Sequence, residues 1–395
     1  MSVQTNARAR PAPARRRPPA HRRPSSQPRR RRFRRILTIA ALLALLPALI
    51  SYANMVATPS NSSLSINSVE WLRQNGMRGF VNRVESIYYS MTAPSTGGPA
   101  LKSLPHQAAV AAAAARARQR VHYYLPHRIR PVIHPALPGE GVWKATFAGG
   151  GYPPPVMITS FRPSPLYPQL VAGVAWINTR RTSIWLYPGM QEPAVTMPSR
   201  GPEEVPMSQR SKLVATFNSA FKLQDSGGGF VSGGHTYAPM KNGLATIVRY
   251  KDGRMDIMPW SYGPNAPSDV IYARQNLPLI VNNSKLNPNL SDGPEWGATL
   301  GNAVLVWRSG LGIDKHGNLI YAAANDQTVA SLAQILKRAG AVRAMELDIN
   351  SYWPSFITYQ HPGARNPANL LPDMARSPFR YLTPDDRDFF AVYLR

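Results

Sequence analysis

Hydrophobic and polar residues are arranged differently on the two sides of residue 141. Beyond it the chain consists of short apolar runs separated by Gly, Pro, Asn and Asp, such as VMITSF (156–161) and KLVATFN (212–218). This pattern predicts strands joined by turns. Asp252-Gly253 lies between two such runs and is typical of a hairpin turn. AVLVW (303–307) and GLGI (310–313) are predicted as separate strands.

One helix is well specified in this half, from about Thr328 to Ala339. Its apolar residues recur at helical spacing, basic residues occupy its last turn, and Gly340 follows it. Few helices among many strands predict a sheet-dominated α+β domain over residues 141–395.

The first 140 residues follow other patterns. Residues 1–35 contain 13 arginines and no acid, which predicts a disordered basic tail. Residues 36–53 are an uncharged apolar run, about long enough to span a bilayer, so residues 36–57 are predicted as a transmembrane signal anchor. Residues 58–140 are expected to form a helical and Pro-rich linker region. In it, residues 65–90 should form one or two amphipathic helices broken near Gly76 and Gly79, packed on the domain or on the membrane surface.

The net charge of the chain is +26, and the arginines of its N-terminal tail, which supply half of it, can be interpreted in two ways. An Arg-rich arm can bind nucleic acid through phosphates, but here an apolar segment follows it directly. The positive-inside rule therefore favours a single-pass membrane protein with a cytoplasmic N-terminus and an extracytoplasmic C-terminal domain, and we expect no nucleic-acid partner. Ser51-Tyr52-Ala53 and Arg31-Arg32-Phe33 leave open a cleaved export signal, which would release the protein outside the cytoplasm.

The chain has no cysteine, which excludes disulfides, thiolate zinc sites and cysteine nucleophiles. His122, His127 and His134 match no metal-binding motif and are expected to be exposed. We therefore expect neither a metal nor another cofactor.

Several polar residues follow predicted strands and are candidates for a ligand site. VRAMELDI (342–349) should present Glu346, Asp348 and Asn350 on one face, either in a cleft or on a solvent-facing sheet edge. Further candidates for sugar or anion binding, on or after strands, are Asn218, Lys222, Arg274 and Arg308. The glycine-rich segment 226–243 is either a mobile hairpin or a ligand loop.

These motifs resemble the phosphodiester glycosidase family, most closely over residues 212–356. ATFNSAFK (215–222) is similar to the family's asparagine-ending strand, and the run from Arg308 to Asp348 is similar to its Arg…Asp-Gly…helix…Leu-Asp order. The N-terminal region looks like that of membrane-anchored actinobacterial members. The family has three glycines after the aspartate, whereas this chain has Ile349, Asn350 and Ser351, followed by Tyr352 and Trp353.

The resemblance implies a sugar-phosphate site that contains Asn218, Arg308 and Asp348. The leading hypothesis is an extracytoplasmic, membrane-anchored hydrolase of sugar-1-phosphodiester linkages in envelope glycans or glycolipids. Asp348 is the expected catalytic carboxylate and Glu346 the second choice, with phosphate held by Arg308 and Lys222. The alternative is a non-catalytic envelope protein that binds anionic glycopolymers.

Overall fold

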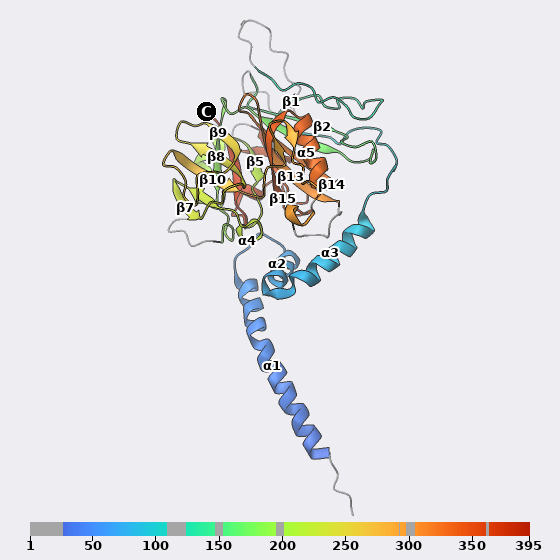
Figure 1. Cartoon of the computed structure of the whole chain (residues 1–395), viewed down its shortest axis with the longest axis vertical. Coiled ribbons are helices and arrows are strands. Elements are labelled where there is room, and N and C mark those ends of the chain that lie inside the picture. Colours follow the sequence, from blue (N-terminus) through green and yellow to red (C-terminus); the bar gives the residue numbers. More distant parts are fainter. Residues whose placement is uncertain are drawn as a thin grey trace, which may run out of the picture. The chain divides into compact units, whose positions relative to one another are not determined.

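The computed structural model describes residues 27–108, 124–146, 153–194, 201–291, 293–297, 305–360 and 363–395 (Figure 1). Its chain divides into two compact units, Met1–Ala57 and Thr58–Arg395. The Ala-rich stretch 108–120, part of the region expected to be helical and Pro-rich, lies almost entirely outside the described residues.

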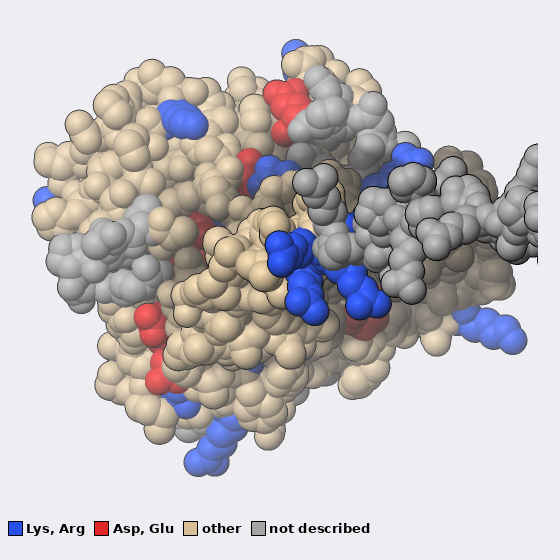
Figure 2. All heavy atoms as spheres, turned by 90° about the horizontal axis from the view of Figure 1, so that it is seen from below, with Lys and Arg blue, Asp and Glu red and all other residues tan. Residues whose placement is uncertain are grey.

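The first unit contains the helix α1 (Gln27–Ala57). Its stretch from residue 36 to 57 has no charged residue and would be about 33 Å long at 1.5 Å per residue, enough for a bilayer core. By length and composition α1 is a candidate membrane span or signal sequence. It begins inside the tail that was expected to be disordered, and residues 1–26 lie outside the described part. Its first turns carry exposed arginines, and Figure 2 shows basic side chains gathered beside the grey residues.

The second unit begins with two helices, which are separated by a break near Gly76 as the apolar spacing predicted. They are α2 (Leu64–Leu72) and α3 (Arg78–Thr92), joined by a π-helical turn (Arg73–Met77) in which Gly76 has a φ of 84°. Glycine adopts this left-handed conformation at little cost, so the chain can change direction there.

The rest of the unit is built on three sheets, in which all the pairings between described strands are antiparallel. The largest sheet has, in spatial order, β1 (Lys144–Ala145), β2 (Val156–Phe161), β3 (Ala172–Ile177), β14 (Leu319–Gln327), β13 (Val306–Asp314), β15 (Ala341–Ile349), β11 (Val281–Asn282) and β12 (Lys285–Leu286). The second has β7 (His235–Ala238), β6 (Phe230–Ser232), β10 (Val270–Gln275), β8 (Ala245–Tyr250) and β9 (Met255–Pro259). The third has β17 (Arg365–Asn369), β16 (Phe356–Gln360), β5 (Leu213–Asn218), β18 (Phe389–Leu394) and β4 (Thr182–Tyr187).

Helices are few in this unit, so the predicted sheet-dominated α+β fold is confirmed. The short helix α4 (Leu223–Ser226) follows β5, and α5 (Val329–Arg338) begins after the N-cap Thr328. Three short 3-10 turns complete the set among the described residues: Met207–Lys212, Gly293–Trp296 and Arg380–Leu382. The predicted turn at Asp252-Gly253 joins β8 to β9. The two strands predicted at 303–307 and 310–313 are instead one strand, β13, because its pairing with β14 and β15 continues across the small residues between them.

The main core lies between the three sheets and brings together aromatic rings from separate strands. Phe217 of β5 stacks on Phe390 of β18 and on Phe356 of β16, with ring centroids 5.0 Å and 5.9 Å apart. A second cluster is formed by α5 and the outer face of the largest sheet. A Cβ at Gly310 of β13 would lie 2.8 Å from a side-chain carbon of Leu336 in α5, so a larger residue there would displace its neighbours.

Candidate active site

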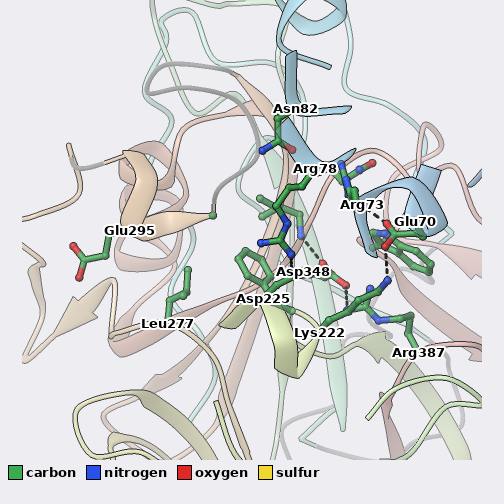
Figure 3. Close-up of a pocket in the computed structure, with 15 residues that line it drawn as sticks. Glu70, Arg73, Arg78, Asn82, Lys222, Asp225, Leu277, Glu295, Asp348 and Arg387 are labelled. Carbon is green, nitrogen blue, oxygen red and sulfur yellow. Dashed lines mark hydrogen bonds and ion pairs between the residues drawn. The ribbon is translucent and has the colours of Figure 1, made fainter. Parts of the chain in front are cut away.

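A cavity of about 150 Å³ lies where several separate stretches of the second unit meet (Figure 3). Asp348 comes from the end of β15, Lys222 from the loop after β5, and Arg387 from the segment before β18. Glu70 of α2 and several residues of the following turn and helix line the opposite side. The cavity is smaller than the roughly 300–1,000 Å³ typical of ligand pockets, because these helical side chains project into it.

Asp348 is held firmly at the inner wall. Its backbone N–H donates to the carbonyl of Ser219 (3.1 Å), and its carboxylate accepts from the backbone N–H of Ile349 (3.1 Å). Its Oδ2 lies 2.9 Å from a guanidinium nitrogen of Arg387. Burial raises the pKa of Asp348 to about 6, although Arg387 opposes part of that rise. This carboxyl group therefore titrates close to the pH at which a catalytic carboxylate is useful.

Arg387 is the main member of the site that the sequence did not single out. Besides Asp348 it contacts the carbonyl of Ala220 (3.1 Å), and its guanidinium lies 4.8 Å from the ring centroid of Trp353. Burial alone would lower its pKa, but Asp348, Glu192 and other carboxylates raise the pKa of Arg387 above its usual value. A fixed, permanently charged fork at the cavity wall suits a phosphate. The only sequence signal was an arginine set among three aspartates at 385–388.

Lys222 reaches the cavity and forms an ion pair with Glu70. Glu70 also accepts from Arg73 (3.2 Å), which in turn binds Glu85 of α3 (2.5 Å). Burial would raise the pKa of Glu70, but the neighbouring Lys222 ammonium and Arg73 guanidinium hold it below its usual value. Glu70 is therefore an ionised carboxylate placed against the cation that an anionic ligand would use.

Asn350 also lines the cavity, but it lies just beyond the end of β15, although the sequence pattern placed it on that strand. Its φ is 87°, so the chain leaves β15 at this residue. Its backbone N–H donates to Trp307 (2.9 Å) and its side-chain oxygen accepts from the N–H of Tyr352 (3.2 Å). β15 itself pairs with β13 and β11, so it is not the solvent-facing edge that the sequence left open.

Glu346 and Arg308 form a buried pair, and neither is among the described residues that line the cavity. The Arg308 guanidinium lies 2.5 Å from the Glu346 carboxylate and donates to the carbonyl of Gln327 (2.9 Å). Burial raises the pKa of Glu346 to about 7, against the opposing effect of Arg308. The second oxygen of this carboxylate has no hydrogen-bond partner among the described groups. In this structure the pair links β13 to β15.

Asn218 and Arg274 are also placed within the protein, outside the set of described cavity-lining residues. Asn218 donates to Ser309 (3.0 Å) and accepts from the hydroxyl of Tyr321 (2.9 Å), so it joins the third sheet to the first. Arg274 is fully buried, pairs with Asp388 (2.8 Å) and donates to the carbonyl of Phe221 (2.6 Å). Phe221 and Asp388 adjoin Lys222 and Arg387 in the sequence, so Arg274 holds in place the backbone that carries these two cations.

The other sequence candidates lie elsewhere. The glycine-rich segment contains the β6–β7 hairpin, and its Gly229 and Lys241 N–H groups donate to the side chain of Gln275 (2.9 and 2.8 Å). His127 and His134 are exposed, and His122 lies outside the described residues. Sequence and structure thus agree on Asp348, Lys222 and Asn350 as cavity residues.

Comparison with solved structures finds similar chains of low sequence identity. The catalytic domain of zebrafish N-acetylglucosamine-1-phosphodiester alpha-N-acetylglucosaminidase, auto-inhibited by its pro-peptide, is 17% identical, with a TM-score of 0.42 over 62% of this chain and 85% of that one. A hypothetical protein from Synechocystis is 14% identical (TM-score 0.33, 57% of this chain and 59% of that one). A putative exported protein from Burkholderia pseudomallei is 11% identical (TM-score 0.33, 57% and 74%).

No curated protein sequence matches the chain. Residues 211–348, which run from the start of β5 to Asp348, match the sequence model of the phosphodiester glycosidase family. The match covers about a third of the chain, and over this stretch the chain is similar to the phosphodiester glycosidase family, as its motifs led us to expect.

Proposed function

We propose that this protein is a membrane-anchored, extracytoplasmic hydrolase of sugar-1-phosphodiester linkages in envelope glycans or glycolipids. The observation that carries the proposal is the convergence of the Asp348 carboxylate with the cations of Arg387 and Lys222 in a single cavity. The family match over 211–348 supports the reaction class. The apolar helix α1 supports the anchor, with the N-terminus in the cytoplasm.

The chemistry follows from what each group can do. In the reaction, the bond between the anomeric carbon and the phosphate oxygen breaks, a water oxygen bonds to that carbon and gives up one proton to solvent, and a phosphomonoester leaves with the bonding electron pair. The phosphate is a good leaving group, so the site must mainly bind it, which Arg387 and Lys222 can do as charge-assisted donors. The ionised Asp348 then stabilises the positive charge that develops on the sugar ring.

This assignment changes the phosphate ligands expected from the sequence. Arg308 was expected to hold phosphate, but it is not among the described residues that line the cavity, whereas Arg387 is, so Arg387 takes that role in the proposal. Glu346 and Asn218 keep the sheets in register around the cavity. Asn350 remains a candidate contact for a sugar hydroxyl.

Turnover tests the proposal. The full chain, purified in a mild detergent, is offered a panel of sugar-1-phosphodiesters, beside Asp348→Ala and the exposed control Asp252→Ala. We expect release of free sugar by the wild type and the Asp252 variant, and none by the Asp348 variant. Turnover that survives in Asp348→Ala would refute the assignment of the carboxylate.

A second candidate function is binding of anionic glycopolymers without catalysis. It is favoured by the bulky residues after Asp348, since Ile349, Asn350 and Trp353 line the cavity where the family has glycines close by. Saturable binding of the panel without turnover in the wild type would select this function.

A further inference from the structure

The helix α3 carries a continuous apolar strip on its outer surface. Met77, just before the helix, and Phe80, Val84, Ile87, Tyr88 and Met91 are all between 43% and 80% exposed. At about 100° per residue, their positions fall within a sector roughly 100° wide. Isolated exposed hydrophobic residues are ordinary, but a strip four turns long indicates a contact surface.

The side of α3 next to the strip, together with the side beyond it, contacts the domain. Val81 is buried, Glu85 is bound by Arg73, and Arg78 forms an ion pair with Asp225 (2.5 Å). The strip is therefore turned away from the domain, at least from its described part. Arg83 is exposed beside the strip, while Glu85, the one acid of α3, is neutralised by its partner.

The connection to α1 limits which partner can reach this surface. α1 ends at Ala57. Three residues that follow soon after donate hydrogen bonds to the domain: Ser60 to Asp386 (2.7 Å), Asn61 to Asp385 (2.8 Å) and Ser62 to Asp386 (2.5 Å). Two residues separate the end of the apolar helix from the first of these contacts, which extended chain covers in about 10 Å. If α1 spans a bilayer, the domain is thus held at the headgroup layer. A short tether, an apolar helical strip and an exposed arginine suit an anionic lipid surface.

We propose that the apolar strip of α3 is a membrane-contact surface that embeds in the lipid interface. The same helix lines the cavity through Arg78 and Asn82. Contact of α3 with lipid would therefore hold the cavity close to the bilayer surface, so the substrate class is a lipid-borne glycosyl phosphodiester whose head group reaches the cavity from the membrane. This statement about the substrate rests on the proposed function, whereas the membrane contact does not.

Because the chain has no cysteine, single cysteines report on α3 without background. The full chain is reconstituted in phosphatidylglycerol/phosphatidylethanolamine vesicles and labelled with a polarity-sensitive fluorophore at Ile87→Cys or, as the matched control, at its neighbour Ser86→Cys. We expect the label at Ile87 to shift to shorter wavelength and to be quenched several-fold more strongly by nitroxide lipids than the label at Ser86. Equal access of both labels to aqueous iodide would overturn the membrane contact. So would a signal at Ile87 that depends on protein density instead of lipid quencher, since a second copy would then cover the strip.

Activity separates the substrate claim from the proposed function. In vesicles, the double variant Phe80→Ser/Ile87→Ser should lose about tenfold in turnover of a lipid-borne sugar-1-phosphodiester, because the cavity is no longer held at the bilayer. Turnover of a water-soluble analogue should stay within about twofold, since neither residue lines the cavity. Equal turnover of the lipid-borne substrate by wild type and variant would overturn the substrate claim. Absence of turnover of both substrates by the wild type would overturn the proposed function, and the fluorescence result would still decide the membrane contact.

Discussion

Replacing Asp348 with Asn should make the protein more stable at neutral pH while it abolishes turnover. Burial raises the pKa of this carboxyl group from an ordinary value of 3.8 to about 6. Between these values the folded protein holds a proton that the unfolded chain has lost, so the free energy of unfolding falls as the pH rises. The change is roughly two pH units, and at 1.36 kcal/mol per unit the ionised carboxylate costs about 3 kcal/mol above pH 6.

An amide of the same shape does not carry this cost. We expect the difference in unfolding free energy between Asp348→Asn and the wild type to be close to zero at pH 4. It should grow to about 3 kcal/mol in favour of the variant at pH 8. Denaturant unfolding of the full chain in detergent, repeated across this pH range, measures the difference.

Asp385 supplies a control of opposite sign. Burial would raise its pKa, but the guanidinium groups of Arg380 and Arg376 hold the pKa of Asp385 below its usual value. Its contribution to stability is present above the unfolded pKa and is lost as the pH falls. Asp385→Asn should therefore destabilise the protein at pH 8, by about 3–5 kcal/mol for a broken buried pair, and by less at low pH. A less stable Asp348→Asn protein at pH 8, or a gain that does not depend on pH, would refute this reasoning.

Three further predictions concern the cavity and its support. The kcat/KM of the wild type for a sugar-1-phosphodiester should fall below about pH 6, because the ionised form of Asp348 is the active one; a profile that is flat from pH 4.5 to 8 would contradict this. Glu70→Gln should lower KM several-fold with little change in kcat, because its carboxylate no longer competes with substrate phosphate for Lys222; an unchanged or higher KM would show that Glu70 does not compete. Arg274→Met should cost about 3–5 kcal/mol in denaturant unfolding, because it leaves the buried Asp388 carboxylate without its partner, whereas a change below 1 kcal/mol would show that the pair is dispensable.

The fold could be predicted from the sequence because its strands and helices are encoded locally. The strand at 156–161 and the helix after Thr328 follow from apolar spacing and from cap residues within a few positions. The division of β13 into two predicted strands shows the limit of this reasoning. Small residues interrupt its apolar pattern, and only pairing with both neighbours shows that the strand continues.

The site could be predicted only in part, because its members pair over long distances in the sequence. Asp348 follows from strand alternation and from the family motif. Arg308 was also predicted from its strand, because a cation on an apolar strand suggests an anion site. Its partner Glu346 lies on the neighbouring strand, so Arg308 forms a buried ion pair there and does not line the cavity. Glu70 and Arg387 come from opposite ends of the second unit, so no local pattern connects them with Asp348.

The order of strands in the third sheet affects how the protein must fold. β18 lies between β4 and β5. Among the described strands of that sheet, β4 pairs with β18 and with no other strand. β4 and β5 are made roughly 200 and 170 residues before β18, so during synthesis both present unpaired edges for most of the time the domain is emerging. Folding of this sheet is therefore dominated by distant contacts and should be slow. We expect incomplete chains to depend on chaperones, and Arg387, two residues before β18, to reach the cavity only when the sheet closes.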